Sequence, residues 1–120
     1  MGDAIGTVGA VVINVADYEA EKAFWGAFLG TGILREFPGI CWFEPQHEGG
    51  VCVALQQSDA PGDTGGRVHL DTGVADIAEA RARIEELGGS HVEDHEIMGF
   101  RWAIMADPEG NRFCIASGEG

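Results

Sequence analysis

The sequence repeats one pattern twice, and this repeat limits the chain to folds built from two similar modules. The first copy runs from Ala10 to Gly30 (AVVINVADYEAEKAFWGAFLG) and the second from His69 to Gly89 (HLDTGVADIAEARARIEELGG). Each copy begins with alternating apolar residues, reaches the tripeptide Val-Ala-Asp and continues with the apolar spacing of an amphipathic helix. Because a long period occurs only twice, the sequence favours a duplicated domain over a solenoid.

Local signals set the limits of the two predicted helices. Asp17 and Asp76 are expected N-caps, and Asp76 forms a capping box with Glu79. Gly30 and Gly88 are placed to end the helices in a left-handed turn. The apolar stripes expected to face the core are Ala20, Phe24, Ala27 and Phe28 in the first helix, and Ile77, Ala80, Ile84 and Leu87 in the second.

Short strand-like segments follow each helix, so each module is predicted as strand–helix–strand–strand–strand. The last strand follows a turn in which Asp107, Pro108 and Gly110 suit the first, second and fourth positions. A polar, Gly-rich connector separates the modules within one domain. The expected strands are 32–37, 40–44, 51–57, 90–97, 100–106 and 112–117, in a domain 1–120 with module one about 8–57, linker 58–67 and module two about 68–117.

Composition excludes several classes of partner. A net charge of −13 repels nucleic acid and anionic membrane surfaces, and no basic cluster offsets it. There is neither an apolar run of the ~18 residues that span a bilayer nor a basic segment typical of a signal peptide. Three cysteines without a CxxC pair indicate reduced thiols. We therefore expect a cytoplasmic protein.

Several motifs in this order resemble the vicinal oxygen chelate (VOC) superfamily. They are the RVHLD strand, the Asp-capped helix ending in LGG and the closing DPEGNRFCI, within paired βαβββ modules. The superfamily includes glyoxalase I, extradiol dioxygenases, fosfomycin-modifying enzymes and bleomycin-resistance binding proteins. The resemblance implies an α+β fold in which two βαβββ modules form curved mixed sheets around a cup-shaped cavity. It also implies a homodimer.

Metal-using members of this superfamily hold one divalent ion with four strand residues, typically His or Glu. The resemblance and the module offset of 59 or 60 residues place these positions at Ala10, Ala54, His69 and Cys114. Two alanines offer no lone pair, and His69 is the only residue that matches the expected ligand types. We therefore expect no metal and no other cofactor, with a divalent metal as the alternative.

Two of these positions, His69 and Cys114, are the candidate catalytic residues. Cys114 is either a small buried group or a reactive thiol, and in the second case His69 or Arg112 would lower its pKa. His69 is either structural or a general base that Asp71, two residues further along the strand, orients.

The segment HVEDHE alternates His91, Glu93 and His95 and so predicts three potential ligands on one strand face. This face is either a surface metal site or a solvated strand surface. Acidic residues within the segment favour the solvated surface.

Aromatic residues on the third strands of both modules are candidates for ligand contact. Planar side chains there can stack on a flat ligand, but periodicity leaves open which of two neighbours faces the cavity. The alternatives are Trp42 or Phe43 in the first module and Arg101 or Trp102 in the second. The full set of expected ligand-binding residues is His69, Asp71, Cys114, Trp42, Phe43, Phe100, Trp102 and Arg112.

The sequence thus predicts a glyoxalase-like, bleomycin-resistance-like protein that binds a small amphiphilic or aromatic molecule in its cup without a complete metal site. The alternative is an enzyme of the same superfamily, a lyase, isomerase or dioxygenase, with an altered site around His69. The incomplete ligand set leaves open whether the chain is an enzyme. A small molecule and a second copy of the chain are the expected partners.

Overall fold

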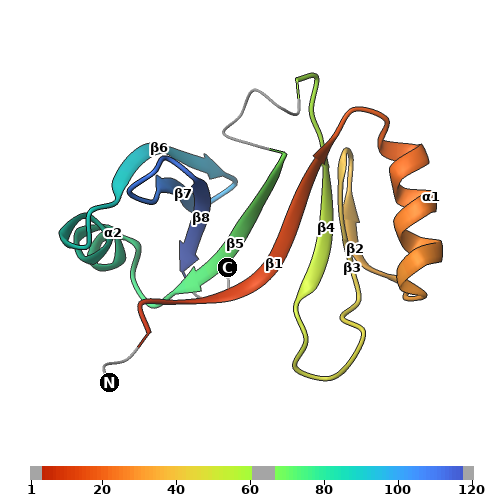
Figure 1. Ribbon diagram of the computed structural model, residues 1–120, viewed down its shortest axis with the longest axis horizontal. Coiled ribbons are helices and arrows are strands. Elements are labelled where there is room, and N and C mark those ends of the chain that lie inside the picture. Colours follow the sequence, from red (N-terminus) through yellow and green to blue (C-terminus); the bar gives the residue numbers. More distant parts are fainter. Residues whose placement is uncertain (1–3, 61–66, 118–120) are drawn as a thin grey trace. The chain divides into compact units, whose positions relative to one another are not determined.

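The computed structural model describes residues 4–60 and 67–117, and the order strand–helix–strand–strand–strand occurs twice (Figure 1). The fold is α+β, as predicted, and all six expected strands agree with the structure to within one residue at each end. Part of the predicted connector, residues 61–66, lies outside the described residues. The elements are β1 (Gly6–Val15), α1 (Tyr18–Leu29), β2 (Ile33–Phe37), β3 (Ile40–Phe43), β4 (Cys52–Gln57), β5 (Val68–Val74), α2 (Ile77–Glu86), β6 (Ser90–Ile97), β7 (Phe100–Ala106) and β8 (Arg112–Ser117).

The chain divides into two compact units, and both boundaries fall inside strands. Unit 1 comprises Met1–Gly9 and Leu70–Gly120, and unit 2 comprises Ala10–His69. The boundaries therefore cross β1 and β5 rather than the connector. Neither helix in the described part of the chain is long and apolar enough to cross a membrane.

Unit 2 carries α1 on one face of the strand order β2-β3-β4-β1, in which β4 and β1 are parallel and the other pairs antiparallel. The buried side chains on this face are Val15, Tyr18, Cys41, Phe43 and Leu55, with Trp25 and Leu29 packed against them.

The predicted stripe of α1 was wrong at its two largest members. Phe24 and Phe28 are 57% and 71% exposed and stack on each other outside the core, with ring centroids 6.2 Å apart. Apolar side chains occupy two neighbouring faces of this helix, so periodicity alone does not select between them. The face that packs carries Tyr18, Trp25 and Leu29.

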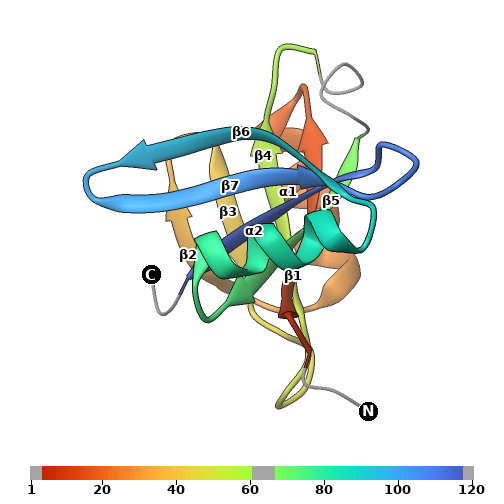
Figure 2. The same ribbon diagram turned by 90° about the vertical axis from the view of Figure 1, so that its left-hand side faces the viewer.

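Unit 1 has the matching strand order β5-β8-β7-β6, with β5 and β8 parallel. Figure 2 shows β6 and β7 as a long hairpin that runs alongside α2. Of the predicted stripe of α2, Ala80 and Ile84 are buried, whereas Leu87 follows the last helical residue and is exposed. The core on this face of the sheet consists of Val74, Ala80, Ile84, Ala103, Met105 and Ile115.

The predicted caps and the final turn are present. The side chains of Asp17 and Asp76 accept hydrogen bonds from the backbone N–H groups of Ala20 and Glu79. Gly30 has the left-handed conformation (φ 71°) that ends α1. Before β8, the Asp107 carboxylate accepts hydrogen bonds from two backbone N–H groups of its own turn, which fixes where the strand begins.

Candidate functional site

The strand pairing in unit 1 places Asp71 and Cys114 on the face of the sheet opposite α2. Successive strand residues alternate between faces, and Ile115 packs in the core beneath α2, so its neighbour Cys114 points the other way. Asp71 is the direct partner of Cys114 in the parallel pair of β5 and β8. Trp102 shares this surface because the next residue, Ala103, packs beneath α2. We call this surface the Cys114 face.

Burial and a carboxylate together keep the Cys114 thiol protonated. Burial, followed by the charge and hydrogen bonding of Asp71, raises the pKa of Cys114 to about 12. Arg112, proposed above as a cation that could lower this pKa, is exposed at the first position of β8 and is not among the groups that shift it. The site thus lacks the electropositive surroundings that activate a thiolate. This favours the interpretation of Cys114 as a small, partly buried group.

The family's four-ligand metal site does not fit the residues of this chain. In unit 2, the parallel pairing of β1 with β4 places Val12 opposite Ala54. In unit 1, the parallel pairing of β5 with β8 places Asp71 opposite Cys114. The matching register supports the assignment of Ala54 as the repeat equivalent of Cys114. Ala10 and Ala54, only 4% and 0% exposed, belong to a small apolar cluster and provide no donor atom.

A smaller group of donors remains on β5 and its neighbour β8. His69 precedes Asp71 by two residues on β5, and potential ligand atoms of His69, Asp71 and Cys114 lie within 4.8 Å of one another. Imidazole, carboxylate and thiolate are all metal ligands, but binding an ion here would require Cys114 to lose its proton.

Three rings form a shelf at the hairpin end of the Cys114 face. Phe100 and Trp102 have centroids 5.6 Å apart, and the imidazole of His95 stacks on Trp102 at 5.1 Å with an interplanar angle of 12°. Nε2 of His95 lies 2.7 Å from a carboxylate oxygen of Glu93. These contacts group three rings, with Phe100 tilted by 34° against Trp102 and one polar edge at His95.

Sequence reasoning did not include His95 in the ligand-binding set, although the hairpin turn carries a signal for it. Met98 and Gly99, both with positive φ, form a two-residue turn and pair Ile97 with Phe100. A two-residue turn of this kind fixes the register of the flanking strands. Counting back from it places His95 opposite Trp102.

The predicted alignment of three ligands in HVEDHE was wrong. The pairing of β6 with β7 is irregular between His91 and Glu93, and such a bulge reverses the facing of later residues. The side chain of His91 therefore contacts the carboxylate of Asp94, 2.9 Å away, and the side chain of His95 contacts that of Glu93. The three side chains do not form one cluster.

The structure also answers the open question of register in unit 2. Trp42 packs against Ala10, Val12 and Ala54 on the face opposite α1, whereas Phe43 is 1% exposed in the core beneath α1. Phe43 therefore lies on the opposite face from Trp42 and is closed to a ligand.

Trp42 and Trp102 also differ in register. Trp42 pairs with Ala54, whereas Trp102 pairs with Ala116, two residues beyond Cys114. They occupy corresponding strands but not corresponding positions.

Comparison with known proteins agrees with this architecture. Residues 10–116 match the family described as Glyoxalase-like domain, and none of the curated proteins matches the chain. The two βαβββ units and this match place the chain in the VOC superfamily. Within it, the chain belongs to the Glyoxalase-like domain family.

Solved structures share the fold at low sequence identity. Methylmalonyl-CoA epimerase from Mycobacterium tuberculosis is 16% identical, with a TM-score of 0.75 over 100% of this chain and 93% of that one. A hypothetical protein from Bacillus halodurans is 17% identical, with a TM-score of 0.72 over 96% of both chains. A methylmalonyl-CoA epimerase in complex with methylmalonyl-CoA and NH4+ is 18% identical, with a TM-score of 0.69 over 98% and 97%. At these identities the likeness concerns the fold alone.

Proposed function

We propose that the chain binds a flat aromatic or amphiphilic small molecule on the Cys114 face, without a complete metal site and without chemistry. The observation that carries this proposal is the shelf of Phe100, Trp102 and His95. Ligand sites are mostly apolar surfaces with a few placed polar groups, and this face adds the Asp71 carboxylate and the Cys114 thiol to the three rings.

The shelf is suited to a planar ligand because its outer ring is accessible. Phe100 is among the exposed large apolar residues, and Trp102 and His95 are half-buried. Each stacking contact of this kind contributes about 0.5–1.5 kcal/mol beyond area burial, so a ligand that covers two rings gains useful affinity without a metal. The Glu93–His95 pair then supplies an in-plane polar contact.

Titration with planar compounds tests the proposal. Quercetin and riboflavin are added to the protein, and binding is followed by quenching of tryptophan fluorescence and by NMR shifts. We expect binding that Trp102→Ala or Phe100→Ala weakens by about tenfold, equivalent to ~1.4 kcal/mol. Phe28→Ala, which removes an exposed phenyl ring of α1, is the matched control and should bind as the wild type does.

Turnover is assayed in parallel with methylglyoxal and glutathione. Absence of binding across the planar panel contradicts the proposal. Turnover that depends on His69 also contradicts it.

The second candidate is an enzyme of the superfamily, a lyase, isomerase or dioxygenase, centred on His69. The closeness of potential ligand atoms in His69, Asp71 and Cys114 favours it. Elemental analysis of protein purified without chelators separates the two candidates. About one Ni, Fe, Mn or Zn per chain, lost in His69→Ala, supports the enzyme, whereas substoichiometric metal supports the binding protein.

The proposal includes the cellular setting and the oligomeric state. Cys41, Cys52 and Cys114 are free thiols, which suits a reducing cytoplasm. A homodimer is the expected assembly, with the exposed strand β2 at its interface.

A further inference from the structure

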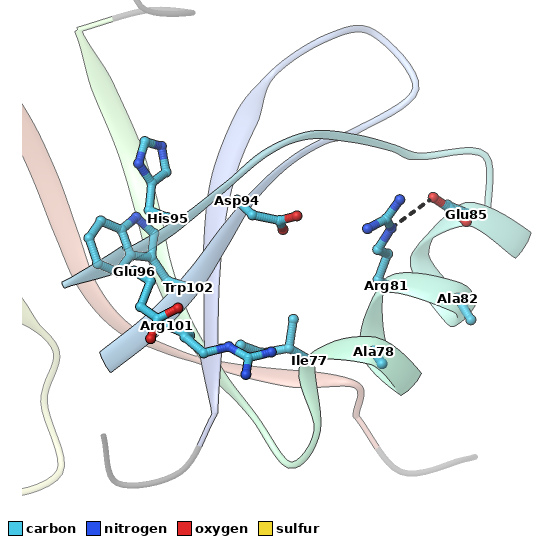
Figure 3. A pocket seen from close by; sticks show the side chains of 10 residues that line it. All are labelled: Ile77, Ala78, Arg81, Ala82, Glu85, Asp94, His95, Glu96, Arg101 and Trp102. Atoms are coloured by element: carbon cyan, nitrogen blue, oxygen red, sulfur yellow. Dashed lines mark hydrogen bonds and ion pairs between the residues drawn. The ribbon is translucent and has the colours of Figure 1, made fainter. Parts of the chain in front are cut away.

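Unit 1 contains a cleft of about 640 Å³ between α2 and the β6–β7 hairpin (Figure 3). The proposed function uses only His95 and Trp102 of its lining, and the volume of the cleft is in the range of small-molecule sites. Figure 3 shows Arg81 reaching from α2 and Asp94 from β6 into the space between them, with His95 and Trp102 at the far end from the helix. The lining residues are Ile77, Ala78, Arg81, Ala82, Glu85, Asp94, His95, Glu96, Arg101 and Trp102.

The helix wall of the cleft is apolar except for one ion pair. Ile77, Ala78 and Ala82 present small aliphatic groups from α2. Arg81 is ion-paired with Glu85 of the next turn, with Nε 3.4 Å from the carboxylate oxygen. This wall therefore offers apolar contact and a cation that is already partly compensated.

The hairpin wall carries charges of both signs. Asp94 accepts a hydrogen bond from His91 at 2.9 Å, and this bond, with smaller contributions from Arg81 and Arg101, holds the pKa of Asp94 below its usual range. Glu96 and Arg101 are direct cross-strand partners. Within the described residues, however, the side chain of neither makes a hydrogen bond or an ion pair.

We infer that this cleft binds a small zwitterion of the amino-acid class. A simple anion would face the carboxylates of Glu85, Asp94 and Glu96, and a simple cation would face Arg81 and Arg101, so neither matches the cleft. A molecule with one carboxylate and one ammonium group satisfies both signs at once.

In this arrangement Arg101 binds the carboxylate, since guanidinium and carboxylate form paired hydrogen bonds. Glu96 and Asp94 bind the ammonium group, and an aliphatic side chain rests against Ile77 and Ala82. The contacts named here lie outside the shelf, so Arg101→Gln tests this proposal separately from ligand binding on the Cys114 face.

Three matched probes test the inference by NMR titration of ¹⁵N-labelled protein. L-Leucine carries both charges, N-acetyl-L-leucine only the carboxylate, and L-leucinamide only the ammonium group. We expect L-leucine to shift signals of α2 and of residues 94–102, and each singly charged probe to bind about tenfold more weakly, because a hydrogen-bonded charge is removed.

Two variants complete the test. Arg101→Gln is expected to weaken L-leucine binding by about tenfold, whereas Arg83→Gln, an exposed arginine of α2 outside the cleft, should leave it unchanged. The spectra of the free variants report whether the fold is intact. Equal binding of the three probes, equal binding by Arg101→Gln and wild type, or no shifts in the cleft at about 10 mM L-leucine overturns the inference.

Discussion

Residues of one type serve different purposes in this chain, according to what surrounds each of them. Cys114 and Cys41 are both free thiols. Cys41 is fully buried beneath α1, whereas Cys114 lies beside the Asp71 carboxylate on the face of the strands that points away from α2. The resemblance predicted that Cys114 occupies a ligand position of the family. It did not show that Asp71 would lie directly beside it, because this depends on the register of two parallel strands.

The environment of Cys114 predicts a slow thiol. With a pKa of about 12, the group stays protonated at neutral pH, so iodoacetamide should alkylate it far more slowly than an ordinary exposed thiol at pH 8. Asp71→Asn removes the neighbouring charge and should speed alkylation several-fold. Mass spectrometry of each cysteine peptide, after treatment with a chelator, measures both rates. Alkylation of Cys114 at the rate of a free thiol would contradict the prediction.

The same shift predicts how stability depends on alkaline pH. The pKa of Cys114 in the folded protein lies above its ordinary value of 9.0, so the folded state favours the protonated thiol. Its stabilising contribution is fully present below pH 9 and is lost as the pH rises toward 12. Cys114→Ala should therefore weaken the fall in stability between these limits. Urea unfolding at pH 8 and pH 10 measures the difference; an unchanged fall in the variant would contradict it.

Gly89, the last residue of the LGG motif, should tolerate no side chain. A Cβ there would lie 2.6 Å from Cγ2 of Ile84 and 2.7 Å from the backbone oxygen of Ala106. Gly89→Ala should lower the free energy of unfolding by about 1–3 kcal/mol, the usual cost of overpacking. Gly73→Ala is the control, since a Cβ at Gly73 meets nothing within 4 Å. Urea denaturation compares them, and equal stability of the two variants would refute the steric explanation.

At the level of helices and strands, the sequence predicted the elements well and their packing faces less well. Caps, glycines and turn residues act locally, so Asp17, Asp76 and Asp107 could be assigned from sequence alone. Which face of α1 packs depends on the whole sheet beneath it, and there Phe24 and Phe28 were misassigned. The bulge in β6 was missed for the same reason, since cross-strand pairing creates it.

One polar connection joins α1 to β2. The Tyr18 hydroxyl donates to a carboxylate oxygen of Glu36 at 2.8 Å, and the Lys22 ammonium lies 2.7 Å from the same oxygen. Lys22 first, and then Tyr18, hold the pKa of Glu36 below its usual range. A carboxylate with a lowered pKa stabilises the folded state above its unfolded pKa, and this contribution is lost as the pH falls through the folded value.

Glu36→Gln should therefore lower the urea midpoint at pH 7, and its difference from wild type should shrink as the pH approaches 3. Glu19→Gln is the control, because Glu19 is highly exposed and lies farther from Lys22, at 3.5 Å. It should change the midpoint less at both pH values. A Glu36→Gln effect of the same size at pH 3 and pH 7 would show that the charge of Glu36 is not its cause.

At the scale of the whole molecule, the repeat made the fold predictable, and the resemblance identified positions rather than chemistry. The resemblance and the repeat offset predicted the family's metal positions, and the alanines at two of them are buried in the structure. The shelf of Phe100, Trp102 and His95 could not be located in the same way, because it depends on one two-residue turn. The stacking of these three side chains could therefore be established only from the structure.

The terminal strands of the two units differ in how they protect their free edges. β6 ends its strand order and carries several acids, which discourage pairing with another chain. β2 also ends its strand order, but every residue is exposed and Ile33, Leu34 and Phe37 are apolar. An exposed apolar edge of this kind is typical of a strand that is covered by a partner. We therefore expect the homodimer to form through β2.

Light scattering coupled to size exclusion should show a dimer at micromolar concentration. Leu34→Glu introduces a charge at the centre of β2, where the side chain is 53% exposed, and should shift the protein to a monomer. Leu87→Glu is the matched control: Leu87 is even more exposed, at 72%, but lies just after α2 and should leave the dimer intact. A monomeric wild type would contradict the dimer itself. If Leu34→Glu remained a dimer, the interface would lie elsewhere, because the introduced glutamates of two paired β2 strands would repel each other strongly.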